Sequence, residues 1–409
     1  MTSRLSGPLR GAARLALSLA FFTTAISPAR SQNAEPDASA ALRGFRVHEW
    51  GTFTVLSGSD GEPVRWFQPP KDLTELPRFV GINPAGAKSA PVPSLLRMET
   101  PVLYFYPPAP LKVRLRAALK SGSITEWFPA PLPPASPAAA GDGSVVWSGE
   151  LLPPTDPVAR QRIPAVGQDA VGRHYVHARA VPEAWLFRSD APTQGDAPNT
   201  DHFIFYRGKG DAGTAYTASA PDDQTVRLHG PSGSAPIPFA LALSVTPAGT
   251  IWTRMPAPGG AAPAEAALDG PRLPTASASP AIAAALREAL VAAGLTPPEA
   301  AGMVATWEGQ WFEEPGTRIL AILPRSMVDA LLPLAIEPKP ETLVRVFVAR
   351  FEVLTPSREA ALAKLYAEPA TAALPERRQA TLDALHLGRF GEGAITRVQA
   401  LLRREGGAQ

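Results

Sequence analysis

The sequence predicts an α+β fold class, with a β-rich, antiparallel, sandwich-like N-terminal domain followed by an α+β C-terminal region. Across residues 45–255, short apolar runs alternate with Pro, Gly and Asp, which is typical of many short strands joined by turns. Across residues 280–409, helix caps and helical periodicity alternate with strand-like runs. The Ala-, Pro- and Gly-rich stretch 256–279 between them predicts an interdomain linker or loop.

The clearest strand of the β-rich region is predicted at residues 112–120. Apolar residues there alternate with lysine and arginine, the period of two that a strand with one buried face requires. A turn at 121–123 leads into a second strand at 124–128, so the pattern predicts a hairpin. Further strands are predicted at 53–56, 102–106, 145–151, 175–181, 184–188, 202–206, 225–229 and 239–245.

In the C-terminal region, Thr296 and Glu299 form a capping box, which predicts a helix that continues to about Phe312. Residues 343–354 are apolar on both strand faces, which predicts a central strand. Further elements are predicted at 281–293 (a helix begun by Ser279 and Pro280), 318–323 (a strand), 326–332 (a short helix), after Pro356 (a helix) and at 375–402 (one or two helices).

Residues 1–31 have the pattern of a secretory signal peptide. Arginines precede an apolar run at 15–26, and small residues at Ala29 and Ser31 mark a cleavage site. The apolar run is shorter than the about 20 residues that cross a bilayer. We therefore expect cleavage near Ser31, a periplasmic or extracellular location, and a disordered lead-in at 32–44.

Composition narrows the classes of function. The chain has 39 Lys+Arg against 37 Asp+Glu, and the leader holds four of those arginines and no acid. A near-neutral mature chain argues against nucleic acid as a partner. The absence of cysteine excludes disulfides, thiolate catalysis, Cys-ligated zinc and a lipoprotein anchor. We expect no cofactor and no membrane anchor in the mature chain, and the oligomeric state stays open.

Histidines provide the candidate metal ligands His48, His174, His177 and His202. His48 and Glu49 begin a predicted strand, where neighbouring side chains point to opposite faces, so they serve one site only if the backbone is irregular. His174 and His177 likewise fall on opposite faces of a strand. The alternative for His48 and Glu49 is that backbone groups satisfy both at a strand end.

Carboxylates beside tryptophans suggest sugar chemistry. Sugar-binding clefts combine aromatic faces with carboxylates, and glycosidases need two carboxylates at the scissile bond. The candidate catalytic residues are Glu49, Glu99 and Glu126, and the candidate ligand contacts are Trp50, Trp127 and Arg207. The alternative is that each tryptophan packs in the core while its neighbouring glutamate faces water.

Four segments together resemble a group of exported bacterial proteins. They are 48–54 (HEWGTFT), 98–106 (METPVLYFY), 202–208 (HFIFYRG) and the stretch 303–354. The resemblance covers most of the mature chain and implies a common fold and export. It transfers no catalytic role to any residue.

The sequence is consistent with two functions. The first is an exported binding or cell-envelope module for glycan-like ligands. The second is a secreted hydrolase, with glycosidase-like carboxylates or a histidine-based metal site. The hydrolase requires that two of its carboxylates meet within about 10 Å in one pocket. Carboxylates scattered on opposite faces of a sheet would contradict it.

Overall fold

The computed structural model describes residues 41–66, 76–82, 93–134, 143–167, 172–193, 197–211, 214–231, 233, 235–256, 262–367 and 374–406. The predicted signal peptide at 1–31 and residues 32–40 of the predicted lead-in lie outside these ranges. The remainder of the lead-in belongs to the first strand, which begins at Leu42. Helices and large antiparallel sheets are both present, which confirms the predicted α+β class.

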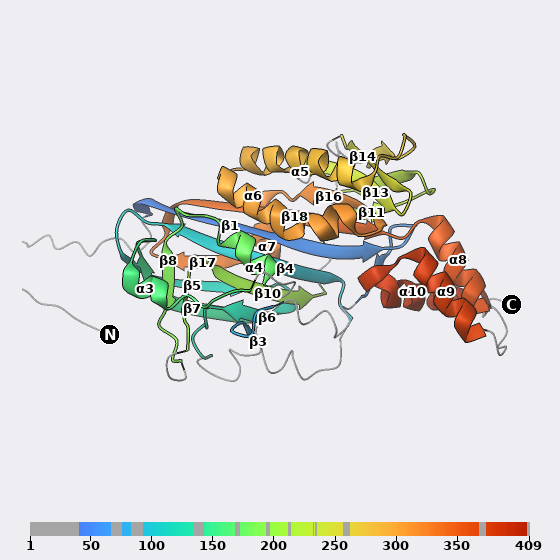
Figure 1. Cartoon of the computed structure of the whole chain (residues 1–409). Coiled ribbons are helices and arrows are strands. Elements are labelled where there is room, and N and C mark those ends of the chain that lie inside the picture. Colours follow the sequence, from blue (N-terminus) through green and yellow to red (C-terminus); the bar gives the residue numbers. More distant parts are fainter. Residues whose placement is uncertain are drawn as a thin grey trace, which may run out of the picture. The chain divides into compact units, whose positions relative to one another are not determined.

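A ten-stranded sheet forms the centre of the structure (Figure 1). Its order is β14-β13-β16-β18-β1-β4-β10-β6-β3, and β2 pairs with β1. The strands are β1 (Leu42–Ser57), β2 (Pro63–Val64), β3 (Gly81–Ile82), β4 (Leu96–Tyr106), β6 (Gly122–Phe128), β10 (Ile204–Gly210), β13 (Phe239–Thr246), β14 (Gly249–Arg254), β16 (Gly316–Ile322) and β18 (Pro340–Val353).

The two long strands β1 and β18 lie side by side in parallel, and β4 and β16 flank them. This placement confirms that residues 343–354 form a central strand, as their two-sided apolarity predicted. β1 belongs to the predicted N-terminal domain and β18 to the predicted C-terminal region, so their pairing joins both regions in one sheet. The stretch 256–279 therefore does not divide the chain into two domains. That stretch instead contains β15 (Ala264–Ala267), which pairs with β12 (Thr225–His229), and the start of helix α5.

Two smaller sheets complete the β structure. The five-stranded sheet has the order β17-β5-β7-β8-β9, and the three-stranded sheet has the order β11-β12-β15. The remaining strands are β5 (Leu111–Ala118), β7 (Ser144–Leu152), β8 (Leu186–Ser189), β9 (Thr200–Asp201), β11 (Thr217–Ser219) and β17 (Leu334–Glu337).

The predicted hairpin is wrong, although both of its strands exist. β5 pairs with β17 and β7, whereas β6 pairs with β10 and β3. The turn at Ser121, which has a φ of 53°, therefore carries the chain from one sheet to another. The predicted alternation of buried and exposed side chains in β5 is confirmed. Val113, Leu115 and Ala117 are buried, and the lysine and arginines that alternate with them are exposed. Alternation fixes which face is buried but not which strand is the neighbour.

Side-chain alternation divides the large sheet into two faces. The sandwich face carries Phe45, Val47 and Glu49, and it packs against residues of the five- and three-stranded sheets. The helix face carries His48 and Trp50. It is covered by α4 (Arg173–Ala178), α5 (Thr275–Ala292), α6 (Pro297–Glu308) and the π-helix η2 (Gly309–Glu313). Figure 1 shows α5 and α6 on one side of β18 and the strands β5, β7 and β17 on the other.

Helix α4 replaces the strand predicted at 175–181. Its Tyr175 and Ala178 are both buried in the core of the helix face, at the three-residue spacing of a helix. The aromatic and β-branched residues of this segment favoured a strand locally, but packing against the neighbouring helix α6 decides the outcome. The strand prediction for His174 and His177 is therefore wrong.

The helices predicted for the C-terminal region are present, and their starts agree with the prediction to different degrees. α6 opens with the predicted capping box of Thr296 and Glu299, which is confirmed. α5 begins at Thr275, so Pro280 lies inside the helix instead of at its first position. The others are α3 (Pro157–Gln161), α7 (Arg325–Leu331), α8 (Pro356–Ala367), α9 (Leu374–Leu385), the 3-10 helix η3 (Gly388–Phe390) and α10 (Gly391–Gly406).

The four C-terminal helices α8, α9, η3 and α10 pack around a small core of their own. This core includes Trp66, Leu362 and Phe390, and it reaches the ends of β1 and β18 through Leu56 and Leu354. Among the helices of the described residues, none combines the length and apolar character needed to span a bilayer.

Candidate functional site

His48 is held by a glutamate that the sequence marked only as a helix cap. The Nδ1 atom of His48 lies 3.0 Å from Oε2 of Glu299, and the hydroxyl of Tyr106 donates to Oε1 at 2.6 Å. The backbone N–H of Thr296 donates to Oε2 of the same carboxylate at 2.7 Å. Burial raises the pKa of Glu299, but the hydrogen bonds from His48 and Tyr106 and the charge of His48 outweigh it, so the net shift is downward.

Glu49 lies on the opposite face of the same strand. Its carboxylate accepts hydrogen bonds from the Tyr206 hydroxyl and from Nε of Arg345, its neighbour across β1 and β18. Arg345 also donates from Nη1 to Asp329 of α7 at 2.8 Å. Burial lowers the pKa of Arg345, but the charge of Glu49 reverses the shift, so the guanidinium stays charged. The expectation that His48 and Glu49 do not serve one site is confirmed.

Glu99 lies on the helix face within an arginine cluster. Its Oε1 accepts from Nη1 of Arg389 at 2.8 Å, and its Oε2 accepts from the Thr54 hydroxyl at 2.7 Å. Burial raises the pKa of Glu99, but Arg389, Arg97 and Arg207 lower it to about 2. A carboxyl group that is ionised at every physiological pH cannot act as a general acid.

Glu126 lies on the same face as Glu99, opposite Arg207 across β6 and β10. It is half-buried and accepts a hydrogen bond from Thr125. Its neighbour Trp127 points to the other face and packs against the sandwich core. Trp50 is completely buried in the helix-face core, so it offers no stacking surface to a ligand.

The three candidate carboxylates therefore do not share one site. Glu49 belongs to the sandwich face, whereas Glu99 belongs to the helix face, where Thr54 and Arg389 hold it. Glu49 and Glu99 are both buried in ion pairs with arginine. This arrangement is that of structural ion pairs and not of a glycosidase cleft, whose two carboxyl groups flank an accessible space.

A second group of buried charges lies on the helix face. Arg318 donates from Nε to Glu352 at 2.9 Å and from Nη1 to the Trp311 carbonyl at 2.9 Å. Arg350 donates to Glu352 and, at 2.8 Å, to Glu314. Burial and then the charge of Arg350 lower the pKa of Arg318 to about 10. These arginines satisfy carbonyls at the end of η2 and have a structural role.

The candidate metal ligands do not form a metal site in the part of the chain that is described. No group of three His, Cys, Asp or Glu side chains there could hold an ion. His48 is bonded to Glu299, and Nδ1 of His202 lies 3.3 Å from the Ala184 carbonyl. His177 lies on α4, and the side chain of His174 is outside the described residues.

One nucleophile–base pair was not predicted. The Ser219 hydroxyl and Nε2 of His229 lie 2.8 Å apart on the neighbouring strands β11 and β12. Burial and the charge of Arg227 lower the pKa of His229. Within the described ranges no carboxylate bonds to the other ring nitrogen of His229. The pair thus lacks the third group that orients the base in a hydrolase triad.

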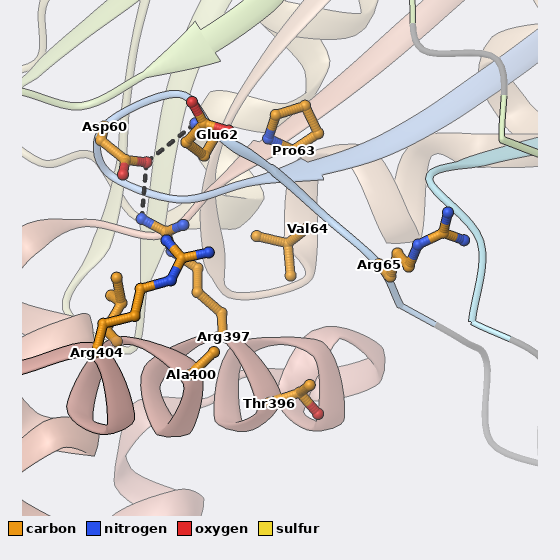
Figure 2. A pocket seen from close by; sticks show the side chains of 10 residues that line it. Asp60, Glu62, Pro63, Val64, Arg65, Thr396, Arg397, Ala400 and Arg404 are labelled. Atoms are coloured by element: carbon orange, nitrogen blue, oxygen red, sulfur yellow. Dashed lines mark hydrogen bonds and ion pairs between the residues drawn. The ribbon is translucent and has the colours of Figure 1, made fainter. Parts of the chain in front are cut away.

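A cavity of about 260 Å³ lies between the turn after β1 and helix α10. Figure 2 shows side chains that line it. Arg397 reaches across it from α10, and its Nη2 donates to Asp60 at 2.7 Å (Figure 2). Its Nε donates to Glu359 at 2.6 Å. The lining mixes both signs of charge, because it contains Glu62 as well as Arg65 and Arg404. Arg397 is thus already paired with Asp60 of the lining and with Glu359.

A second cavity of about 310 Å³ lies between α3 and the strands β8 and β9. Its described lining contains no carboxylate. The lining residues are Val158, Ala159, Arg162, Arg188, Ser189, Ala191, Thr193, Ala197, Asn199 and Thr200. We call this cavity the α3–β9 pocket. Two arginines, three hydroxyls and one amide give it a polar and cationic lining.

Asn199 fixes one wall of the α3–β9 pocket. Its Nδ2 donates to the carbonyls of Ser189 and Ala191 at 3.0 and 3.1 Å, and its Oδ1 accepts from the Ala130 N–H at 3.1 Å. The hydroxyl of Thr200 is buried and has no hydrogen-bond partner among the described residues. No sequence motif marked this pocket, because its walls come from segments on either side of α4.

Comparisons with known proteins assign no family to the chain. No model of a known protein family matches the sequence, and no curated protein is significantly similar to it. Among solved structures, the Fcho1 Mu homology domain of Danio rerio with bound Eps15 peptide is similar at 7% identity and a TM-score of 0.30. That match covers 78% of this chain and 99% of the domain. At this TM-score the similarity supports no statement about fold or function.

Proposed function

We propose that the protein is an exported binding module for a glycan-like ligand that carries an acidic group, with the α3–β9 pocket as its site. One observation carries the proposal: the described lining of the pocket holds Arg162 and Arg188 together with hydroxyl groups, and it holds no carboxylate. Guanidinium groups recognise carboxylates, and hydroxyls recognise the remaining groups of a sugar ring.

Two residues of the pocket have hydrogen-bonding capacity for a ligand. Arg188 uses Nη2 for Glu150, and its side chain is 45% exposed. The Thr200 hydroxyl adds a group without a partner in the described chain. Because Asn199 fixes the wall through three hydrogen bonds, little ordering is needed on binding.

The alternative of a carboxylate-based hydrolase has weaker support. It needs a general acid, whereas the charges of three arginines lower the pKa of Glu99 to about 2. It also needs a partner carboxylate. Of the other two candidate carboxylates, Glu49 lies on the other side of the sheet with Arg345. Glu126 lies on the same face as Glu99, where it accepts a hydrogen bond from Thr125 opposite Arg207. A binding protein requires neither group.

Export is part of the proposal, and the leader at 1–31 supports it together with the resemblance to exported bacterial proteins. Mass spectrometry of native material from the periplasm or medium should give a chain that begins near Gln32. A chain that retains Met1 in the cytosol would contradict export.

The binding test compares acidic with neutral sugars by calorimetry. A uronic-acid oligosaccharide should bind, and a neutral oligosaccharide of the same length should not. Arg188→Gln should weaken binding of the acidic sugar by about tenfold or more, because a charge-assisted contact is lost. Arg227→Gln is the matched control, since Arg227 is also half-exposed and paired with one glutamate, Glu265.

Equal binding of the acidic and neutral sugars would contradict the role of the arginines. Binding that Arg188→Gln leaves unchanged would remove the α3–β9 pocket as the site.

A further inference from the structure

Arg389 presents one unused edge of its guanidinium group although the side chain is buried. Nη1 donates to Glu99 at 2.8 Å, and the side chain is only 8% exposed. The Nε and Nη2 atoms are buried and have no hydrogen-bond partner in the described residues. These two adjacent nitrogens form the fork that binds two oxygens of one carboxylate or phosphate.

Further arginines surround this edge. Arg207 and Arg389 are close enough to Arg97 to lower its pKa, after the larger effect of burial. Glu99 and Glu126 act in the opposite direction. Three guanidinium groups thus share a largely buried region with these two carboxylates. A third carboxylate, Glu314, is also near: burial raises its pKa, but the charges of Arg350 and Arg389 lower it. Burial of donors without partners is costly, so a further negative group would stabilise the cluster.

Trp66 keeps two of these arginines in place. The guanidinium carbon of Arg97 lies 5.4 Å from the centroid of the Trp66 ring, and that of Arg389 lies 5.3 Å from it. Both distances are those of cation–π contacts. Trp66 is itself fixed by Phe390, the residue after Arg389, with ring centroids 4.8 Å apart. The unused edge is therefore held in position before any ligand arrives.

The backbone also directs Arg389 toward the sheet. Gly388 and His386 have φ values of 51° and 48°, so the chain turns sharply between α9 and α10. The short helix η3 between them places Arg389 above the pair of Thr54 and Glu99. A left-handed backbone outside glycine, as at His386, is uncommon and shows that this turn is closely specified.

We propose that a small oxyanion, a phosphate or a carboxylate, binds in bidentate fashion to the Nε and Nη2 edge of Arg389, next to Arg97. We call this the Arg389 site. It is separate from the α3–β9 pocket, whose lining comes from α3, β8, β9 and their neighbours. Its existence does not depend on the proposed function, because the two sites share no residue.

The test measures thermal unfolding of the full mature chain in rising phosphate, with sodium chloride added to keep the ionic strength constant. A ligand that binds only the folded state raises the unfolding temperature with its concentration. Equilibrium dialysis with radiolabelled phosphate then gives the number of bound ions, which should be one. A parallel series with acetate determines whether the site prefers a tetrahedral or a planar oxyanion.

Arg389→Lys is the decisive variant. Lysine keeps a positive charge beside Glu99 but offers no fork, so phosphate affinity should fall about tenfold or more. Arg397→Lys is the matched control, because Arg397 is also about nine-tenths buried among the C-terminal helices. The Nε and Nη2 atoms of Arg397 are already used, by Glu359 and Asp60, so its substitution should leave the phosphate response unchanged.

Two outcomes would overturn the Arg389 site. One is a wild-type protein that responds to neither phosphate nor acetate beyond the chloride series. The other is an equal response in wild type and Arg389→Lys. If Arg389→Lys does not fold, Arg97→Lys provides the second variant, and an unchanged phosphate affinity there would equally contradict the proposal.

Discussion

Nδ1 of His48 and Oε2 of Glu299 lie 3.0 Å apart, and this contact joins the first half of the sheet to the start of helix α6. The same carboxylate closes the capping box with Thr296 and accepts the hydroxyl of Tyr106. One glutamate thus fixes the N-terminus of a helix, an imidazole and a tyrosine.

Glu299→Gln should lower the free energy of unfolding by about 1.5–3 kcal/mol, the usual contribution of hydrogen bonds to a charged group. The amide keeps the shape and an acceptor for Thr296 but loses the charge that faces His48. Denaturant titration gives the value. Glu308→Gln, at an exposed position of the same helix, is the control and should change stability little. Equal effects of the two substitutions would mean that the His48 contact contributes nothing.

The buried pair of Glu49 and Arg345 should show strong coupling. Either Glu49→Leu or Arg345→Met alone leaves one charge buried without its partner and should cost about 3–5 kcal/mol. The double variant removes both charges and should cost less than the sum of the single variants. A double-mutant cycle by chemical denaturation measures the coupling energy. Additive effects would indicate that the two side chains do not interact in solution.

Glu99 should make stability depend on acid pH. Its pKa is about 2 in the folded protein, below the ordinary value of an unfolded glutamate. A lowered folded-state pKa gives stability that is complete above the unfolded pKa and is lost as the pH falls toward 2. The difference in unfolding free energy between wild type and Glu99→Gln should therefore shrink between about pH 4.5 and pH 2. A difference that stays constant over this range would show that Glu99 is not held by Arg389.

Gly51 should resist substitution for steric reasons. A Cβ atom at this position would lie 2.6 Å from Cε1 of Phe347 and 3.0 Å from Cα of Pro101. Gly51→Ala should therefore cost about 1–3 kcal/mol, the range for overpacking a core. Gly270→Ala is the control, because a Cβ there meets nothing within 4 Å. Thermal unfolding of both variants tests the difference, and equal melting temperatures would contradict the close packing of β1 on β18.

Local patterns in the sequence predicted many elements of the fold correctly. The capping box placed the start of α6, and the two-sided apolar run placed β18 at the centre of the sheet. Such features depend on residues that are neighbours in sequence. The hairpin of β5 and β6 and the strand at 175–181 failed because strand partners and helix packing are decided by distant residues.

The candidate site was harder to predict for the same reason. His48, Glu49 and Glu99 were all recognised as unusual, and alternation along the strand correctly separated His48 from Glu49. Their partners Glu299, Arg345 and Arg389 lie far along the chain, and no local spacing relates them. The α3–β9 pocket has no motif either, since its walls come from non-adjacent segments.

The parallel pairing of β1 with β18 sets the order in which the central sheet can fold. β1 lies near the start of the described chain, and one of its edges is paired only by β18, which lies near the end. The central sheet is therefore completed only when nearly the whole polypeptide is present. A prematurely terminated chain that ends before Pro340 would leave β1 with an open edge that recruits other chains into aggregates. Such fragments should accumulate as insoluble material or as substrates for quality-control proteases.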